Sequence, residues 1–279
     1  MKIAITGANG QLGHDLVNLL SHDHQVFGLS RQVMDITNFP QVVETVQRIK
    51  PDAIIHAAAY TRVDEAEHTQ DKAYLVNTYG TRNVAISAQQ AGSKMIYIST
   101  DYVFDGQSST PYKEFDSPNP LTVYGKSKLA AEEIVKNFSN KYFIVRTSWL
   151  YGQYGQNFVK TMLTLAQLRK ELPVVFDQIG SPTYTVDLAY FLKDLLQTEL
   201  YGIYHASNTG ACSWYEFAKA VFEEAGLDIK LNPVETKDFP RPARRPAYSV
   251  LDHMAIRLNG LSDFRTWRDA LKEFVGQLI

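Results

Sequence analysis

The chain has 279 residues, of which 45% are hydrophobic and 21% are charged, a balance typical of folded globular proteins rather than disordered ones. Its 28 basic and 30 acidic side chains leave a formal net charge of -2, which argues against a protein dedicated to nucleic acid or membrane surfaces. The single cysteine, Cys212, excludes an intrachain disulfide, and no apolar run approaches the roughly 20 residues that span a bilayer, so we expect a cytoplasmic protein.

The first half of the chain alternates short β-branched runs with amphipathic segments. The apolar runs predict strands at 3–6, 25–29, 53–56, 94–99 and 142–146. The helical periodicity predicts helices at 12–20, 39–49, 73–91 and 123–137. Repeated strand–helix–strand units are typical of a parallel sheet covered by helices on both faces. We therefore expect an α/β, doubly wound dinucleotide-binding domain in residues 1–150.

The second half of the chain is less regular. Its periodicity predicts helices near 158–168, 186–197, 214–225 and 263–278, and a short strand near Val174. Four prolines within residues 232–246 predict an extended loop. We expect residues 151–279 to form a smaller, mainly helical domain for the substrate, with some later segments joining the first domain.

A glycine-rich segment follows the first predicted strand directly and opens the first predicted helix. Glycines let the backbone turn tightly and approach a pyrophosphate, whose charge then lies at the helix N-terminus. In this setting the segment predicts a dinucleotide site, although a tight turn without a ligand is the simpler alternative. The candidate ligands of the phosphates are Gly7, Asn9, Gly10, Gln11, Leu12 and Gly13.

The end of the second strand indicates which cofactor is preferred. An acidic residue there binds the ribose hydroxyl of NAD, whereas a basic residue accommodates the 2′-phosphate of NADP. This strand is followed by Ser30 and Arg31 with no carboxylate, and Asp35 and Ile36 follow at the expected adenine edge. The pattern favours NADPH and leaves NADH possible, because Arg31 is equally well explained as a solvated loop charge.

A tyrosine and a lysine four residues apart form the most informative chemical pair. Tyr124 and Lys128 share one face of a predicted helix. Acid–base chemistry near neutrality requires the tyrosine phenolate to be stabilised, and a nearby ammonium group does this. The fourth strand ends at Thr100, and the carboxyl ends of strands are where open α/β sheets place their chemistry. The alternative is a surface Tyr/Lys pair beside a strand-capping hydroxyl.

These features together resemble the extended short-chain dehydrogenase/reductase family over nearly the whole chain. The resemblance is carried by the glycine loop, the Ala57-Ala58-Ala59 string, Asn77 in the next helix, and the Thr100/Tyr124/Lys128 triad. Further matching strings lie at 63–67, 99–106, 120–125, 146–152 and 245–249. The resemblance implies a Rossmann-type fold, a nicotinamide-dependent oxidoreductase, and cofactor contacts from Ala57, Ala58, Ala59 and Asn77.

The matching strings are most similar to those of reductases that act on nucleotide-linked keto sugars. The resemblance implies reduction of the C4 keto group of a dTDP-4-dehydro-6-deoxy-L-hexose by NADPH, giving dTDP-L-rhamnose in the last step of its biosynthesis. Tyr124 would protonate the alkoxide, Lys128 would lower the pKa of Tyr124 and hold the nicotinamide ribose, and Thr100 would bond the keto oxygen. The implied substrate contacts are Tyr102, Val103, Trp149, Asn157, Arg241 and Arg245, with Arg244 as a further cation near the diphosphate.

Other functions remain open. Dehydratases of the same fold carry an Asp-Glu pair after the strand-four threonine, whereas here Asp101 is followed by Tyr102, so dehydration is disfavoured. A 4-epimerase would be expected to read NAD with an acidic residue that the second strand lacks. A non-catalytic NADP-binding regulatory subunit, as found in a partner of methionine adenosyltransferase, would not need the triad.

The sequence leaves the metal and the oligomeric state open. Some similar reductases hold a divalent cation such as Mg²⁺ near a subunit interface, and Asp15 lies where one acidic ligand is expected. No partner ligands are identifiable, so no metal ligand is assigned. The chain is expected to act as a monomer or homodimer on a small-molecule dTDP-sugar, without nucleic-acid or membrane partners.

Overall fold

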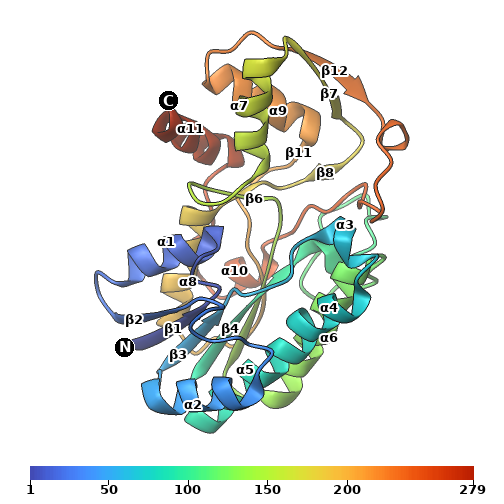
Figure 1. Ribbon diagram of the computed structural model, residues 1–279. Helices are drawn as coiled ribbons and strands as arrows, with labels where there is room; N and C mark the ends of the chain where they lie inside the picture. Colours follow the sequence, from blue (N-terminus) through green and yellow to red (C-terminus); the bar gives the residue numbers. More distant parts are fainter.

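The computed structural model describes residues 1–279 and is built around a six-stranded parallel sheet (Figure 1). The strand order is β10-β5-β4-β3-β1-β2. Strand β2 lies on one side of β1 and the later strands lie on its other side, as in doubly wound sheets. The strands are β1 (Lys2–Thr6), β2 (Gln25–Leu29), β3 (Ala53–His56), β4 (Lys94–Thr100), β5 (Tyr142–Thr147) and β10 (Gly202–His205). The five strands predicted in the first half are confirmed, and β10 was not predicted.

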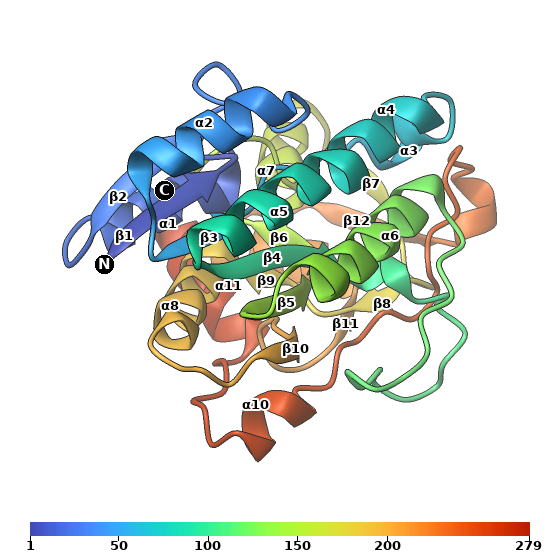
Figure 2. The same cartoon turned by 90° about the horizontal axis from the view of Figure 1, so that it is seen from below.

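Helices cover both faces of this sheet (Figures 1 and 2). One face packs against α1 (Gln11–Leu20), α8 (Thr185–Leu196) and α10 (Met254–Leu258), with a core that includes Ile5, Leu16 and Leu192. The other face packs against α2 (Phe39–Ile49), α5 (Thr81–Ala91) and α6 (Val123–Phe138). The strands are apolar on both sides because neither face meets water.

The helix predicted at 73–91 is interrupted. It consists of α4 (Gln70–Tyr74), a π-helical turn η1 (Leu75–Gly80) and α5, and it is preceded by the short helix α3 (Val63–Ala66). A π-turn inserts one extra residue into a helix and is frequent at functional sites. Here it carries Asn77, whose side chain is almost completely buried.

The second unit combines three helices with three two-stranded sheets. The helices α7 (Phe158–Leu168), α9 (Trp214–Glu224) and α11 (Trp267–Leu278) pack around a separate apolar core. The strand pairs are β7 (Glu171–Val175) with β12 (Lys230–Val234), β8 (Ile179–Gly180) with β11 (Cys212–Ser213), and β6 (Leu150–Tyr151) with β9 (Thr183–Tyr184). The extended loop predicted at 232–246 is therefore wrong at its start, because Asn232, Pro233 and Val234 pair with β7.

After residue 150 the chain passes back and forth between the two units. Helix α8, strand β10 and helix α10 all return to the layer of the six-stranded sheet. No helix has both the length and the apolar character needed to cross a membrane. The units meet above the carboxyl ends of the sheet strands, and a cavity opens there.

Candidate active site

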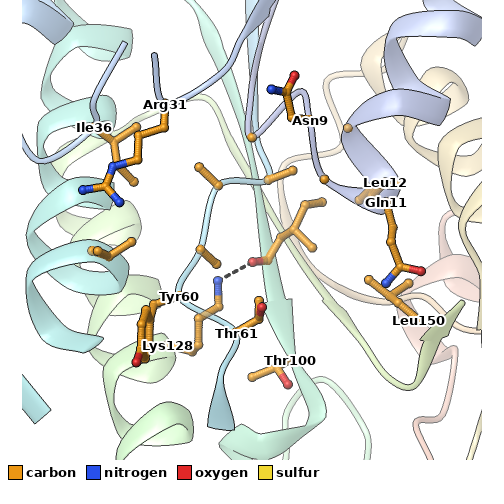
Figure 3. A pocket seen from close by; sticks show the side chains of 18 of the residues that line it. Asn9, Gln11, Leu12, Arg31, Ile36, Tyr60, Thr61, Thr100, Lys128 and Leu150 are labelled. Atoms are coloured by element: carbon orange, nitrogen blue, oxygen red, sulfur yellow. Dashed lines mark hydrogen bonds between the residues drawn. The ribbon is translucent and has the colours of Figure 1, made fainter. Parts of the chain in front are cut away.

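A cavity of about 850 Å³ lies at the carboxyl ends of the parallel strands (Figure 3). Its lining comes from the segments that follow β1, β2, β3 and β4, from α6, and from the stretch after β5. Most residues predicted from the sequence line it: Gly7, Asn9, Gly10, Gln11, Leu12, Gly13, Ser30, Arg31, Asp35, Ile36, Ala57, Ala58, Ala59, Thr100, Tyr102, Tyr124, Lys128 and Trp149. The topology thus gathers distant sequence motifs into one site.

The glycine loop is tightly packed against the segment after β3. Gly7 has a φ of +70°, and a Cβ atom on it would lie 2.7 Å from the backbone nitrogen of Ala58. A Cβ on Gly13 would lie 2.2 Å from the carbonyl oxygen of Gly7. The first turn of α1 has no side-chain cap, since its N-cap is Gly10. This close, donor-rich backbone fits a dinucleotide pyrophosphate.

A buried histidine is hydrogen-bonded to the end of β1, where the glycine loop begins. His56 Nδ1 lies 2.7 Å from the Thr6 hydroxyl, and its Nε2 lies 3.0 Å from the Thr81 hydroxyl. Thr6 accepts a bond from the Ala58 N–H, and Thr81 donates to the Asn77 carbonyl, so we infer a neutral imidazole that accepts at Nδ1 and donates at Nε2. Burial, reinforced by the charge of Lys128, lowers the pKa of His56 to about 3.

An exposed cation lies in the segment that follows β2, which also lines the cavity. Arg31 keeps 82% of its side chain exposed and lies 3.6 Å from the Asp35 carboxylate. Asp35 also accepts hydrogen bonds from the backbone and hydroxyl of Thr37. The guanidinium is therefore only loosely held and is available to an anionic group on a ligand.

The triad residues meet at the other end of the cavity. Lys128 Nζ donates to the Ile98 carbonyl oxygen at 2.6 Å, the dashed bond of Figure 3, and lies 4.1 Å from the centroid of the Tyr97 ring. The Thr100 hydroxyl donates to Asp101 Oδ1 at 3.1 Å and accepts the Tyr102 N–H at 3.2 Å. All three triad side chains are at least nine-tenths buried.

Burial dominates the ionisation of these groups. Burial raises the pKa of Tyr124 to about 12, and a hydrogen bond with Thr100 opposes the rise. Burial lowers the pKa of Lys128 to about 7, against the favourable charge of Glu132. We expected Lys128 to lower the pKa of Tyr124. In the structure, desolvation of the phenolate outweighs the other effects, and the pKa of Tyr124 is raised.

Aromatic side chains form the wall between the two units. Trp149 adopts a left-handed backbone conformation with a φ of +48°, which is rare for a bulky residue. Its ring stacks on Trp214 of α9 with ring centroids 3.5 Å apart. It also covers Gly180, where a Cβ atom would lie 2.6 Å from the indole. The second unit thereby holds a flat apolar surface at the rim of the cavity.

Arg244 and five other predicted residues lie outside the cavity lining. The side chain of Val103, a predicted sugar contact, does not line the cavity and is fully buried in a cluster with Phe104, Tyr112 and Leu251. A residue in the turn after a strand points inward or outward according to tertiary packing, which its sequence position does not reveal.

Three of the remaining residues, Asn77, Asn157 and Arg245, have structural contacts. Asn77 holds the backbone of Tyr60 through both of its amide atoms, at 2.7 and 3.2 Å. Asn157 caps α7 and donates to Gln11 at 3.0 Å, which joins the second unit to the glycine loop. Arg245 is paired with the Asp64 carboxylate at 2.8 Å. Arg241 is exposed.

The structure adds residues that the sequence did not single out. Tyr60, Thr61 and Lys72 also line the cavity. Tyr60 and Thr61 directly follow the alanine string after β3, so their position in the sequence could have predicted that they line the cavity. Lys72 and Trp214 depend on packing between elements and carried no such signal. A second cavity, of about 570 Å³, is lined by Arg244 and Arg245 among others.

Asp15, the candidate acidic ligand, has no cluster of metal-binding side chains around it within this chain. No group of three or more His, Cys, Asp or Glu side chains is placed to hold a metal ion. Asp15 is buried beside the Thr185 hydroxyl, and burial raises the pKa of its carboxyl.

Comparison with known proteins finds relatives that match the chain over nearly its full length. The family model described as the RmlD substrate binding domain matches residues 1–279. The chain is 45% identical to the spore coat polysaccharide biosynthesis protein SpsK of Bacillus subtilis over 98% of its own length and 96% of that protein. It is 44% identical to a dTDP-4-dehydrorhamnose reductase of Aggregatibacter actinomycetemcomitans, over 97% of each chain.

A solved structure is also very similar. The dTDP-4-dehydrorhamnose reductase of Bacillus anthracis, determined in complex with NADP, superimposes with a TM-score of 0.98 at 50% sequence identity. The match covers 99% of each chain. At this similarity the likeness extends to both units of the structure and to the cleft between them.

Proposed function

Because the chain belongs to the family of the RmlD substrate binding domain, we propose that it is an NADPH-dependent dTDP-4-dehydrorhamnose reductase that forms dTDP-L-rhamnose. One observation supports this most directly: a single cavity joins the glycine loop at one end to Thr100, Tyr124 and Lys128 at the other. The partner is a small dTDP-sugar that the chain meets in the cytoplasm, as a monomer or homodimer.

The cofactor half of the cleft is suited to NADPH. When bound, NADPH supplies the hydride for the carbonyl carbon. The backbone of Gly7 to Gly13 would hold its pyrophosphate, since side chains are excluded there at Gly7 and Gly13. Arg31, with Ser30 beside it, would contact the 2′-phosphate, and its exposure leaves it free to do so.

Tyr124 is suited to giving a proton to the substrate. Reduction of a ketone leaves an alkoxide that must be protonated, so the donor has to carry its proton at neutral pH. The raised pKa of Tyr124, about 12, keeps the phenol protonated until the alkoxide develops.

Thr100 and Lys128 hold the reacting groups in place. The Thr100 hydroxyl lies beside Tyr124 and would orient the keto oxygen toward the phenol. Lys128 is fixed by the Ile98 carbonyl at 2.6 Å, from where its remaining donors face the cavity that takes the nicotinamide ribose. Tyr102 and Trp149 offer apolar surface to the sugar.

The test is NADPH oxidation by the purified protein with enzymatically prepared dTDP-4-dehydrorhamnose. The expected result is substrate-dependent oxidation and a product with the mass and chromatographic mobility of dTDP-L-rhamnose. Tyr124→Phe should lose at least about 100-fold in turnover and keep its NADPH affinity. Folded protein that binds NADPH but shows no turnover would favour the non-catalytic regulatory function.

A further inference from the structure

The indole of Trp149 lines the cavity but is held by a side chain that lies outside it. Trp149 follows β5, and its ring stacks on that of Trp214 with the ring planes 7° from parallel and the centroids 3.5 Å apart. Trp214 is the first residue of α9 and does not line the cavity. It also packs on Phe158 of α7, at a centroid distance of 4.4 Å. Trp214 therefore faces a ligand in the cavity only through the ring that it supports.

The backbone of Trp149 is fixed in a conformation that bulky residues rarely adopt. Its φ of +48° lies in the left-handed region, and such a residue persists where the surrounding structure holds it. The carbonyl oxygen of Trp149 accepts the N–H of Thr183 at 3.3 Å. The preceding residue, Ser148, donates its hydroxyl to the Ser181 carbonyl oxygen at 2.6 Å. These bonds attach this turn to the segment that leads into β9, so the side chain of Trp149 leaves the backbone in a set direction.

A second contact holds the indole against the backbone of Gly180. A Cβ atom on Gly180 would lie 2.6 Å from Cε2 of the indole, 2.8 Å from Cζ2 and 2.9 Å from Nε1, so only a glycine leaves room for the ring. Gly180 pairs with Cys212 across β8 and β11, and Trp214 begins α9 two residues after Cys212. The two contacts thus come from one small sheet and the helix that continues from it. We call Trp214 and Gly180 together the indole support.

An indole that is already ordered binds a ligand more tightly than a mobile one. A tryptophan at the rim of a cavity can occupy several rotamers, and a ligand that contacts one of them must supply the free energy that orders the side chain. Packing of two aromatic side chains stabilises one arrangement of the pair. The indole support therefore orders Trp149 before a ligand arrives.

We propose that Trp214 is a positioning residue, which together with Gly180 holds the Trp149 indole in the orientation that contacts the sugar of the substrate. The inference rests on the reaction proposed above, in which Trp149 offers apolar surface to that sugar. The indole support acts on binding of the sugar nucleotide and supplies neither proton nor hydride. Its loss should therefore raise KM for the sugar nucleotide and leave kcat nearly unchanged.

Trp214→Leu tests the stack in steady-state kinetics. Leucine stays apolar but removes the ring, so KM for the sugar nucleotide should rise about three- to tenfold, with kcat and NADPH affinity within about twofold of wild type. Trp214→Phe keeps an aromatic ring and should recover most of the loss. Trp267→Leu is the matched control, because Trp267 packs on Phe217 in the same core, and its KM should equal that of wild type. Equal KM values for the two leucine variants would overturn the proposal.

A double-mutant cycle shows whether Trp214 acts through Trp149. Trp149→Ala removes the supported ring, so Trp214→Leu should cause no further rise of KM in that background. Losses that multiply in the double variant would mean that Trp214 acts by another route and would overturn the proposal.

Gly180→Ala tests the second contact without changing the stack. The new Cβ displaces the indole, so KM for the sugar nucleotide should rise while NADPH affinity is kept. An unchanged KM would show that binding of the sugar does not depend on the orientation of the indole.

The fluorescence anisotropy decay of Trp149 separates this inference from the proposed function, because the measurement needs no substrate. The chain has three tryptophans, so Trp267→Phe combined with Trp214→Phe or Trp214→Leu leaves Trp149 as the only indole. The protein with leucine should show a fast local motion of the ring that the protein with phenylalanine lacks. A wild type without turnover would contradict the reductase proposal, whereas identical decays in these two proteins would contradict the positioning of Trp149 by Trp214.

Discussion

Arg146 and Glu132 form a bidentate ion pair that is almost completely shielded from water beneath the active site. Arg146 Nη2 lies 2.7 Å from Glu132 Oε2, and Arg146 Nε lies 3.0 Å from Oε1, with exposed fractions of 1% and 0%. Ser99 also donates to Glu132 at 2.6 Å. Glu132 lies one helical turn beyond Lys128, so the pair joins β4, β5 and the catalytic helix.

Arg146→Met should destabilise the protein strongly. The substitution leaves the Glu132 carboxylate buried without its partner, which costs about 3–5 kcal/mol in the free energy of unfolding. Urea denaturation at pH 7 measures the change. The double variant Arg146→Met/Glu132→Leu should recover much of the loss, because no charge stays buried. A loss below about 1 kcal/mol in the single variant would show that Glu132 is not held as a buried anion.

Gly13→Ala should abolish tight NADPH binding. The new Cβ would lie 2.2 Å from the Gly7 carbonyl oxygen, so the glycine loop has to move away from α1. We expect NADPH affinity, measured by fluorescence titration, to fall by at least about 100-fold because the pyrophosphate loses its backbone donors. Gly276→Ala in α11 meets no neighbouring atom and is the control. Equal affinity in the two variants would place the pyrophosphate elsewhere.

Arg31→Ala should change cofactor preference with little effect on stability. Its ion pair with Asp35 is exposed, and such pairs contribute little. Loss of a charge-assisted bond to the 2′-phosphate should weaken NADPH binding about tenfold and leave NADH binding unchanged. Arg48→Ala, at an exposed site on α2, is the comparison. If the affinities for NADPH and NADH fell equally, Arg31 would contact a part of the nucleotide that both cofactors share.

His56→Gln should reduce the sensitivity of the fold to acid. The pKa of His56 is about 3 in the folded protein and about 6.5 in an unfolded chain. Between these values the unfolded chain binds a proton that the folded chain does not, so stability falls as pH falls, by up to about 1.4 kcal/mol per pH unit. We would measure the free energy of unfolding by urea denaturation at pH 7, 6 and 5. Its slope against pH should be smaller in the variant, by an amount that corresponds to at most one bound proton. An unchanged slope would mean that His56 is charged in the fold.

The first five strands were predictable because parallel strands buried on both faces are continuously apolar, as at Ile54 and Ile55. Strand β10 was not, since Gly202–His205 is short and is recognised only by its pairing with β5. The glycine loop and triad were predictable because their chemistry depends on local spacing. The stack of Trp149 on Trp214 was not, because a tertiary contact between two units has no local pattern.

The place of β10 in the sheet has a consequence for synthesis of the chain. When β5 has left the ribosome, it is an open edge, and its neighbour β10 follows only at Gly202–His205. Helix α8, which covers the sheet beside α1, is also made late. An unpaired apolar edge promotes association with other chains. The nascent protein therefore passes through an interval in which its nucleotide-binding layer is incomplete, and that interval ends only when most of the chain has been made.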